Sequence, residues 1–344
     1  MKERKIWKTR ILLFIAAAFI LSVTTINVNA EAVEVSPTPT LESISILETS
    51  KSARKIEEYW TAERMKNAIP MPNPEISEEE FQRLINTPQE EESKSQEESK
   101  SVESSFVGES KVIVDTAGVP TRANVNEFPF SSGGKFFFTK PGVGDYSCSA
   151  QFVGSRRVIM TAAHCLKNYE TGKQYSNFLF RRAYNDGGGQ PVGWECGALS
   201  ADWIVGPNNP PNWPSDYGFL YASSDSDVGA LGLKTNIPYS TWTAIGYPDN
   251  YGRNKYMYKV DGSKGTVSNG VVEMRDNPMR SGNSGGAWIG DLTTNPYPGA
   301  NYAIGLNSFH REDPTSEFGP YFDNDTYFIF EFVKNHCRVP SPNK

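Results

Sequence analysis

The pattern of apolar residues changes along the chain, and from about Val112 onward it consists of short runs separated by turn residues. Gly-Gly, Asn-Asp-Gly and Pro-Asp-Asn clusters lie between these runs. Short apolar runs bounded in this way are typical of β-strands. The strands that this pattern predicts are residues 135–138, 149–153, 158–160, 178–180, 217–221, 271–274 and 302–306.

Helical patterns are scarce in this part of the chain. One segment, residues 325–337, has Phe328, Phe332 and Val333 at helical spacing and predicts a terminal helix. Many short strands at turn-sized intervals indicate an all-β sandwich or barrel architecture, and the 234 residues of 111–344 suffice for two such units.

Residues 31–110 predict a helical segment followed by a linker. We expect one helix around residues 54–60 and a second short helix from Ser77. Residues 87–105 contain six Glu, two Lys and six Ser, and Val102 is their one large apolar residue. Such a stretch buries too little apolar surface to offset its ordering entropy, so a disordered linker is predicted. This layout is typical of a pro-region, although a solvated spacer would have the same composition.

The first 30 residues have the features of an export signal. Five basic residues precede an apolar stretch from Ile11 to Val23, and Val28-Asn29-Ala30 is a small-residue cleavage site. The apolar stretch is thirteen residues long, whereas a membrane-spanning helix needs about 20. We therefore expect a signal peptide (1–30), a pro-region (31–110) and a main domain (111–344) of a secreted protein without a stable membrane anchor.

Composition limits the partners and sites that the chain could have. With 12% aromatic residues, 29 Gly and 23 Pro, it suits a β-rich protein with many turns, and its net charge of −6 offers no basic surface for nucleic acid. The three histidines stand far apart and no cysteine pair has CxxC spacing, so no structural zinc is expected. Export permits disulfides, and spacing alone leaves three pairings open for Cys148, Cys165, Cys196 and Cys337.

The candidate nucleophile is Ser284, in Gly282-Asn283-Ser284-Gly285-Gly286. Glycines on both sides allow a tight turn and free backbone N–H groups to face a developing oxyanion. Taken alone, the motif fits a surface turn equally well. The residues that decide between these readings lie upstream.

A base is available in His164, which follows the predicted strand 158–160 among small residues. A histidine at a strand end is held rigidly and left uncrowded, as a general base requires. The third member of such a site is a buried carboxylate that orients the imidazole. Asp216 is preferred, because Asp-Tyr-Gly-Phe-Leu-Tyr places it at the head of a strand entering the core, and Asp202 is the alternative.

Together these residues resemble the trypsin/chymotrypsin-like serine proteases. The matching motifs are Thr-Ala-Ala-His-Cys around His164, Asp-Tyr-Gly-Phe-Leu from Asp216 and Gly-Asn-Ser-Gly-Gly around Ser284, in that order. The chain is most similar to the bacterial branch containing the glutamyl endopeptidases, which shares Gly-Asn-Ser and a Gly-Tyr-Pro segment, here residues 246–248. The resemblance covers about residues 120–335. It implies two six-stranded antiparallel β-barrels, an active site between them and a C-terminal helix.

The resemblance also implies roles for individual residues of a serine endopeptidase that needs no metal or organic cofactor. The N–H groups of Gly282 and Ser284 would form the oxyanion hole. The short loop and the resemblance together pair Cys148 with Cys165, which leaves Cys196 for Cys337. The residues expected to bind a protein or peptide substrate are Met279 in the pocket wall and Leu306, Asn307 and Ser308 in a strand that aligns the substrate. We expect a monomer.

Two departures from the family pattern bear on activation and specificity. Asn283 replaces the aspartate that pairs with a new N-terminal amine in digestive relatives, so that switch cannot act here in the same form. We expect instead a pro-region that inhibits the enzyme through the helical segment around Trp60, with processing between about Ser105 and Arg122. Asn307 stands where glutamyl endopeptidases place a histidine, which argues against acidic specificity.

Two other functions are open to the same motifs. An α/β-hydrolase esterase would also contain Gly-x-Ser-x-Gly, but it needs the order Ser, Asp, His and a succession of βαβ units, which this chain lacks. A non-catalytic secreted binding protein on a protease scaffold is the second alternative. Such proteins usually lose a member of the triad, whereas all three are present here.

Overall fold

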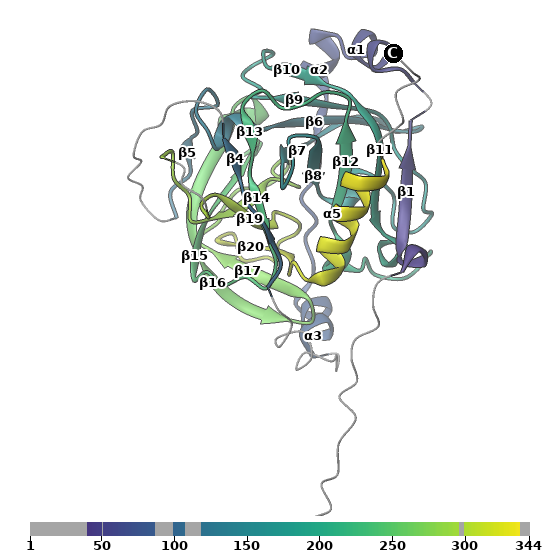
Figure 1. Cartoon of the computed structure of the whole chain (residues 1–344). Helices are drawn as coiled ribbons and strands as arrows, with labels where there is room; N and C mark the ends of the chain where they lie inside the picture. Colours follow the sequence, from purple (N-terminus) through teal and green to yellow (C-terminus); the bar gives the residue numbers. More distant parts are fainter. Residues whose placement is uncertain (1–39, 50, 87–98, 107–117, 296–298, 338–344) are drawn as a thin grey trace, which may run out of the picture. The chain divides into compact units, whose positions relative to one another are not determined.

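The computed structural model describes residues 40–49, 51–86, 99–106, 118–295 and 299–337. The chain divides into two units, residues 1–35 and 36–344, and every described residue belongs to the second. The predicted signal peptide and residues 87–98 of the predicted linker lie outside the described residues. Most elements of the described unit are β-strands, arranged in two main sheets (Figure 1).

The first sheet contains three consecutive phenylalanines in β6, and all three are fully buried. Because successive side chains of a strand point to opposite faces, both faces of β6 must be covered. Phe138 stacks on Tyr175 and Phe137 contacts Trp60 of the N-terminal segment. The strands, in the order β11-β12-β8-β7-β6-β9-β10, are Trp194–Ser200, Gly218–Ala222, Val158–Thr161, Gly144–Phe152, Gly133–Lys140, Ser176–Arg182 and Gln190–Val192.

The second sheet has the order β20-β17-β16-β15-β18-β19, extended by β14 and β3, with β5 pairing with β16. A core of large apolar residues, in which Trp242 stacks on Trp288, lies against it. Its strands are β3 (Ser101–Val102), β5 (Thr121–Arg122), β14 (Gly232–Lys234), β15 (Thr241–Gly246), β16 (Tyr258–Ser268), β17 (Val271–Arg275), β18 (Ala287–Gly290), β19 (Tyr302–Leu306) and β20 (Ser316–Pro320).

The predicted all-β fold with a terminal helix is confirmed, and all seven predicted strands overlap strands of the structure. Six longer strands form the body of each sheet, as the resemblance implied. Within the described chain each sheet also gains three further strands, so that each has nine. Three of these additions, β1 (Ile44–Glu48), β2 (Ile69–Pro70) and β3, come from the predicted pro-region.

The C-terminal helix α5 (Asn324–His336) begins at a capping box formed by Asp323 and Thr326. It packs near the outer face of β11 and β12, where Phe330 contacts Phe219 (Figure 1). The buried face is formed by Ile329, Phe330 and Val333, whereas the predicted Phe328 and Phe332 are half-buried beside it. The predicted helix is therefore present, but turned slightly from the expected face.

Two disulfides join the four cysteines in the pairs that were expected, Cys148–Cys165 and Cys196–Cys337. The second closes a loop of 141 residues and ties the end of α5 to β11. We expect replacement of Cys196 and Cys337 by serine to lower the free energy of unfolding by about 2–4 kcal/mol. Urea unfolding of the double variant checks this value, and non-reducing peptide mapping checks the pairing; a Cys148–Cys196 link would contradict it.

The predicted helix around Trp60 is two short helices, α1 (Ala53–Tyr59) and α2 (Ala62–Asn67), and Trp60 lies between them. Its indole Nε1 donates a hydrogen bond to the Asn177 carbonyl, at 2.6 Å. A third helix, α3 (Glu78–Asn86), follows Ser77, whose Oγ accepts from the Glu80 N–H as an N-cap. Among the described residues, no helix is both long and apolar enough to cross a membrane.

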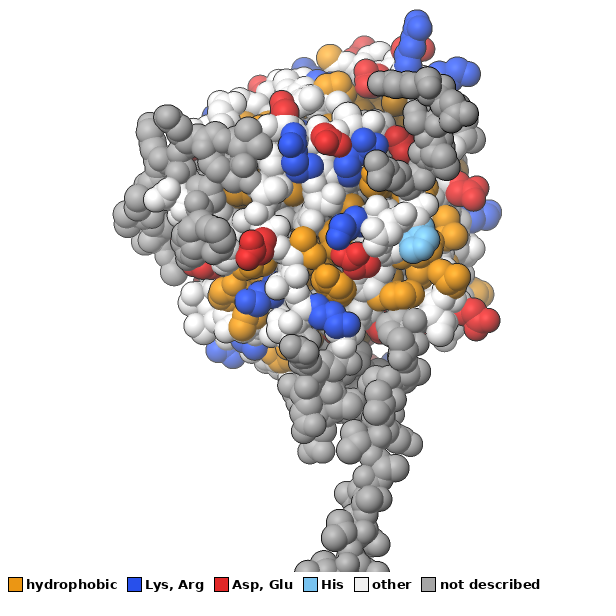
Figure 2. Space-filling view, in the orientation of Figure 1, with side chains coloured by type: hydrophobic (Ala, Val, Ile, Leu, Met, Phe, Trp, Pro, Cys, Tyr) orange, Lys and Arg blue, Asp and Glu red, His pale blue; other side chains and the backbone are white. Residues whose placement is uncertain are grey.

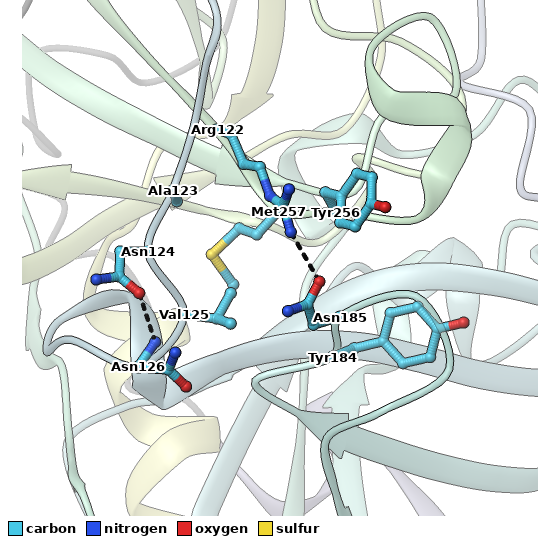
Figure 3. Close-up of a pocket in the computed structure, with 9 residues that line it drawn as sticks. All are labelled: Arg122, Ala123, Asn124, Val125, Asn126, Tyr184, Asn185, Tyr256 and Met257. Atoms are coloured by element: carbon cyan, nitrogen blue, oxygen red, sulfur yellow. Dashed lines mark hydrogen bonds between the residues drawn. The ribbon is translucent and has the colours of Figure 1, made fainter.

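The last residues of the predicted linker are ordered by pairing with the main domain. Besides β3, the strand β4 (Ser105–Phe106) pairs with β13 (Gly229–Ala230). Beyond the undescribed residues 107–117, the chain is held again by β5, where the Arg122 guanidinium lies 3.7 Å over the Tyr256 ring and donates to Asn185 (Figure 3).

The space-filling view shows charges of both signs interspersed on one face of the protein (Figure 2).

Candidate active site

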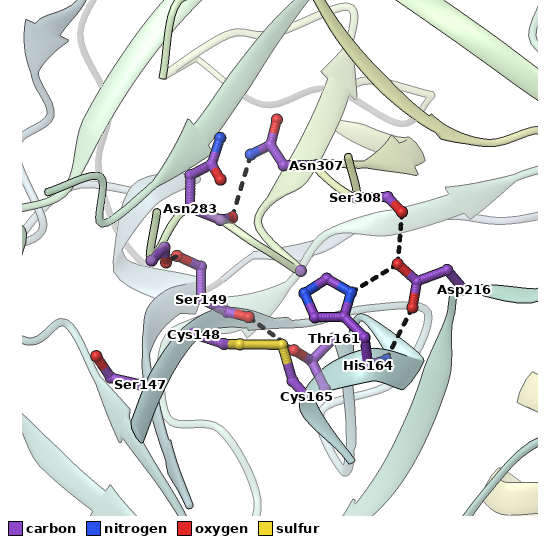
Figure 4. The surroundings of a disulfide bond; sticks show 12 residues. Ser147, Cys148, Ser149, Thr161, His164, Cys165, Asp216, Asn283, Asn307 and Ser308 are labelled. Carbon is purple, nitrogen blue, oxygen red and sulfur yellow. Dashed lines mark hydrogen bonds and ion pairs between the residues drawn. A yellow bond between two sulfur atoms is a disulfide. The ribbon is translucent and has the colours of Figure 1, made fainter. Parts of the chain in front are cut away.

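His164 lies in a single 3-10 turn, Ala163–Cys165, directly after β8. Its ring Nδ1 is 2.7 Å from Asp216 Oδ2, and its backbone N–H donates to Asp216 Oδ1 at 2.8 Å. The Cys148–Cys165 disulfide links the next residue to β7, so the turn is braced on the side away from the carboxylate (Figure 4). The imidazole is thus fixed in position and oriented by one carboxylate, as a general base requires.

Asp216 is fully buried, and the Ser308 hydroxyl donates a further hydrogen bond to its Oδ2 (Figure 4). The alternative carboxylate, Asp202, is exposed at the start of another 3-10 turn. Only Asp216 of these two contacts His164. The side chain of Ser308, a residue of the segment predicted to align substrate, holds the carboxylate in place.

The loop that carries Ser284 depends on glycines with positive φ angles. Gly282 has φ +91° and Gly285 has φ +81°. A Cβ at Gly285 would lie 2.6 Å from the Ser149 carbonyl, and one at Gly282 would lie 2.6 Å from the Tyr247 carbonyl. A larger residue at either position would therefore displace the loop. The Ser284 carbonyl joins this loop to the first sheet by accepting a 2.8 Å hydrogen bond from the Ser149 N–H.

Ser284 is fully buried, and an extended segment of the N-terminal region binds the neighbouring residue Gly282. We call residues 69–76 the strap. The Met71 carbonyl accepts a 2.8 Å hydrogen bond from the Gly282 N–H, which was predicted to face an oxyanion. Neither Ser284 Oγ nor His164 Nε2 has a hydrogen-bond partner within the described part of the chain. In this state the predicted oxyanion donor is already occupied.

The strap pairs with the main domain on both sides of this carbonyl. Before it, β2 pairs in parallel with β7, and the Met71 N–H donates to the Ser147 carbonyl at 2.8 Å. After it, the His310 N–H donates to Pro74 and the His310 carbonyl accepts from Ile76, at 2.8 and 2.9 Å. The backbone of His310 therefore aligns the strap, and this residue lies two positions beyond the predicted segment 306–308.

The other residues predicted to bind substrate lie inside the protein. Met279 is part of the apolar core of the second sheet, and Leu306 is fully buried in β19. The Asn307 amide is occupied by internal bonds: its Oδ1 accepts from Asn277 and Trp288, and its Nδ2 donates to the Ile245 carbonyl. The structure thus gives these three residues supporting positions beneath the loop of Ser284.

A buried pair of ionisable side chains beside this loop was missed in the sequence. Glu317 in β20 is fully buried, and its Oε2 lies 3.3 Å from Nη1 of Arg280. Burial raises the pKa of Glu317 to about 8, against the lowering effects of Arg280 and of the hydrogen bond from Asn73. Asn73, in the strap, donates through Nδ2 to both carboxylate oxygens at 2.9 Å. The pattern of polar and apolar residues along Ser316-Glu317-Phe318 did not indicate that the Glu317 side chain points into the protein.

Cys148, His164 and Cys165 form the one group of metal-ligand residue types in close proximity among the described residues. Both cysteines are joined in a disulfide and offer no thiolate. Zinc ligation by this group would require the bond to be reduced, so the residues fit a braced histidine rather than a metal centre.

No protein-family model matches the sequence, and no curated protein matches it either. Among solved structures, a Glu endopeptidase is 18% identical with a TM-score of 0.51, over 65% of this chain and 99% of the other. A thermostable serine protease from an extremophilic microorganism is 25% identical (TM-score 0.49; 58% and 97% covered), and a protease from Arthrobacter nicotinovorans is 21% identical (0.49; 62% and 99%). The Glu endopeptidase match shows that the chain has the chymotrypsin-like fold.

Proposed function

We propose that this protein is a secreted serine endopeptidase, made as a proenzyme, that cleaves protein or peptide substrates through an acyl-enzyme. The observation that supports this most is the contact of His164 with buried Asp216 on a protease fold, in a chain whose Gly282 N–H binds a peptide carbonyl beside Ser284. These are the parts that acyl transfer needs: a nucleophile, an oriented base and a donor for the oxyanion.

In the proposed reaction, His164 Nε2 takes the proton from Ser284 Oγ as this oxygen attacks the peptide carbonyl. Asp216 keeps the proton of Nδ1 in place and stabilises the imidazolium. The carbonyl oxygen becomes an oxyanion held by the N–H groups of Gly282 and Ser284. His164 then gives its proton to the leaving amine, and water, activated by the same imidazole, hydrolyses the ester.

The pro-region, residues 31–110, is proposed to inhibit the main domain, 111–344, through the strap. The earlier expectation was that the helices around Trp60 cover the cleft, but Trp60 packs on β6 and contacts Phe137. The strap instead occupies the Gly282 N–H, two residues from Ser284. On the other side, Phe81 of α3 packs against Phe318, so both ends of the strap are anchored.

Asn283 supports activation by removal of this cover rather than by a new amine. It is fully buried, and its Nδ2 donates to the Met279 carbonyl at 3.0 Å. An uncharged side chain forms no ion pair with an N-terminal ammonium. Processing is proposed between about Ser105 and Arg122, a range that includes the undescribed residues 107–117.

An irreversible phosphonylating reagent directed at serine tests the proposal. The processed protein should incorporate about one equivalent at Ser284, located by peptide mapping, whereas the unprocessed chain should react far more slowly because Ser284 is buried beneath the strap. A processed protein that takes up no reagent and cleaves no peptide would instead be a non-catalytic binding protein.

A further inference from the structure

We infer that the strap lies in the proposed active site in the direction opposite to that of a substrate, so that Ser284 and His164 cannot cleave it. The inference rests on the proposed function and concerns the regulation of the same site. The observation behind it is the pairing of the strap with the main domain, which is parallel both at β2 with β7 and at Glu75 with His310.

The orientation of His164 sets the direction that a substrate has to take. Its Nδ1 faces Asp216, which also accepts from the Ser308 hydroxyl, so the segment from Ser308 to His310 lies toward that edge of the ring (Figure 4). Nε2, on the other edge, is the atom that protonates the leaving amine, so this amine lies toward β7, where Figure 4 places Ser149. A substrate therefore passes His310 before the attacked carbonyl and runs toward β7 after it.

The strap runs the other way. The Met71 carbonyl accepts a hydrogen bond from the Gly282 N–H, as an attacked carbonyl would. The residues before it, 69–70, pair with β7, whereas the residues after it, 74–76, are bonded to the backbone of His310. A chain in the direction of a substrate would instead pair antiparallel with both segments.

An attack on the Met71 carbonyl would for this reason be unproductive. The nitrogen to be released belongs to Pro72 and starts the arm of the strap that leads to His310, away from β7. His164 Nε2 is then not placed to protonate this nitrogen, and without that proton the intermediate expels the serine oxygen again and the C–N bond stays whole. Proline adds a second obstacle, since its ring fixes the backbone and surrounds the nitrogen.

Three alternating prolines, Pro70, Pro72 and Pro74, suit the strap to this role. Each fixes φ at about −65°, so the free segment has less conformational entropy to lose when it binds. The strap donates to the main domain through the backbone N–H groups of Met71 and Ile76, which are not prolines. The prolines therefore stiffen the strap without removing these hydrogen bonds.

Release of the strap then depends on a cut elsewhere in the chain. The proposed processing between about Ser105 and Arg122 leaves residues 69–76 whole. The pro-region departs as an intact inhibitor that can bind again, so activity after processing should rise with dilution.

The first test measures the direction of the strap without relying on catalysis, in the full chain carrying Ser284→Ala. Mild oxidation should join Glu75→Cys with His310→Cys, because the backbones of these residues pair and their side chains approach to 4.0 Å. Ile69→Cys with His310→Cys is the matched control and should stay unjoined, since a strap in the direction of a substrate would bring the residues before Met71 to His310. Non-reducing peptide mapping that finds the disulfide in the control and not in the first pair would overturn the inference.

The second test measures resistance to cleavage in the active protein. Pro72→Ala in the full chain removes the proline and leaves the chain direction as the obstacle, whereas a quenched peptide of residues 69–76 with the same change can enter the processed enzyme in either direction. We expect the bond between residues 71 and 72 to be cut at least about 100-fold faster in the peptide than in the full chain.

Equal rates at this bond, with Ser284 labelled by the phosphonylating reagent, would mean that the inference alone is wrong. If the processed protein is not labelled and cleaves no peptide, the proposed function is wrong and the inference falls with it.

Discussion

Replacement of Ser284 by alanine is expected to lower kcat by several orders of magnitude while leaving the fold intact. The hydroxyl has no hydrogen-bond partner in the described chain, so its removal breaks no structural contact. The glycines around it, which shape the loop, are unchanged. Peptide hydrolysis by the processed variant and its urea unfolding midpoint are the two measurements.

The controls for this loss follow from the site. Ser224→Ala, at an exposed serine, should keep full activity. Asp216→Asn should lose most activity, because it disturbs the tautomer of His164, whereas Asp202→Asn should keep it. Retained activity in Asp216→Asn together with loss in Asp202→Asn would mean that the carboxylate has been assigned to the wrong residue.

Addition of the separate 31–105 segment is expected to abolish activity of the processed enzyme, with one segment bound per enzyme. The reason is that the strap occupies the Gly282 N–H beside the buried Ser284, while Trp60 anchors it from upstream. Truncating a buried tryptophan typically costs about 3–5 kcal/mol. The Trp60→Ala segment should therefore inhibit at least about 100-fold more weakly.

Inhibition constants from progress curves measure this effect. A segment carrying Glu63→Ala, an exposed residue of α2, is the matched control and should inhibit like the unchanged segment. If the unchanged segment left peptide hydrolysis unaffected even in large excess, the contacts of the strap would have no regulatory role.

Much of the fold and the centre of the site could be predicted, because short stretches of sequence contain the residues that determine them. The strand before His164 is a run of buried apolar residues, and Asp216 precedes another. Strands such as β16 and β20 were missed, because half-exposed or glycine-containing strands lack a continuous apolar run. Their pairing is decided by partners distant in the sequence, which no local window contains.

What local sequence could not show around the substrate site has the same physical origin. Asn307 and Met279 were assigned to the substrate site through the family resemblance, and tertiary contacts turn the side chains of both toward the interior. Glu317 was overlooked because an acid in a short strand is normally solvated, and its burial depends on Arg280 from a separate loop. The strap could not be found either, since Met71 and Asn73 act through a carbonyl and one amide rather than through a recognisable motif.

The pairing of β1 with β11 means that the proposed removal of the pro-region would change the edge of the first sheet. Residues 44–48 cover residues 196–200 along the whole of β1, beside the Cys196–Cys337 disulfide. Once the N-terminal segment departs, the N–H and C=O groups on that side of β11 lose their partners and form a ladder open to any extended chain. In the unprocessed chain this edge of β11 is covered by β1. The processed protein should therefore show more self-association at high concentration than the unprocessed chain.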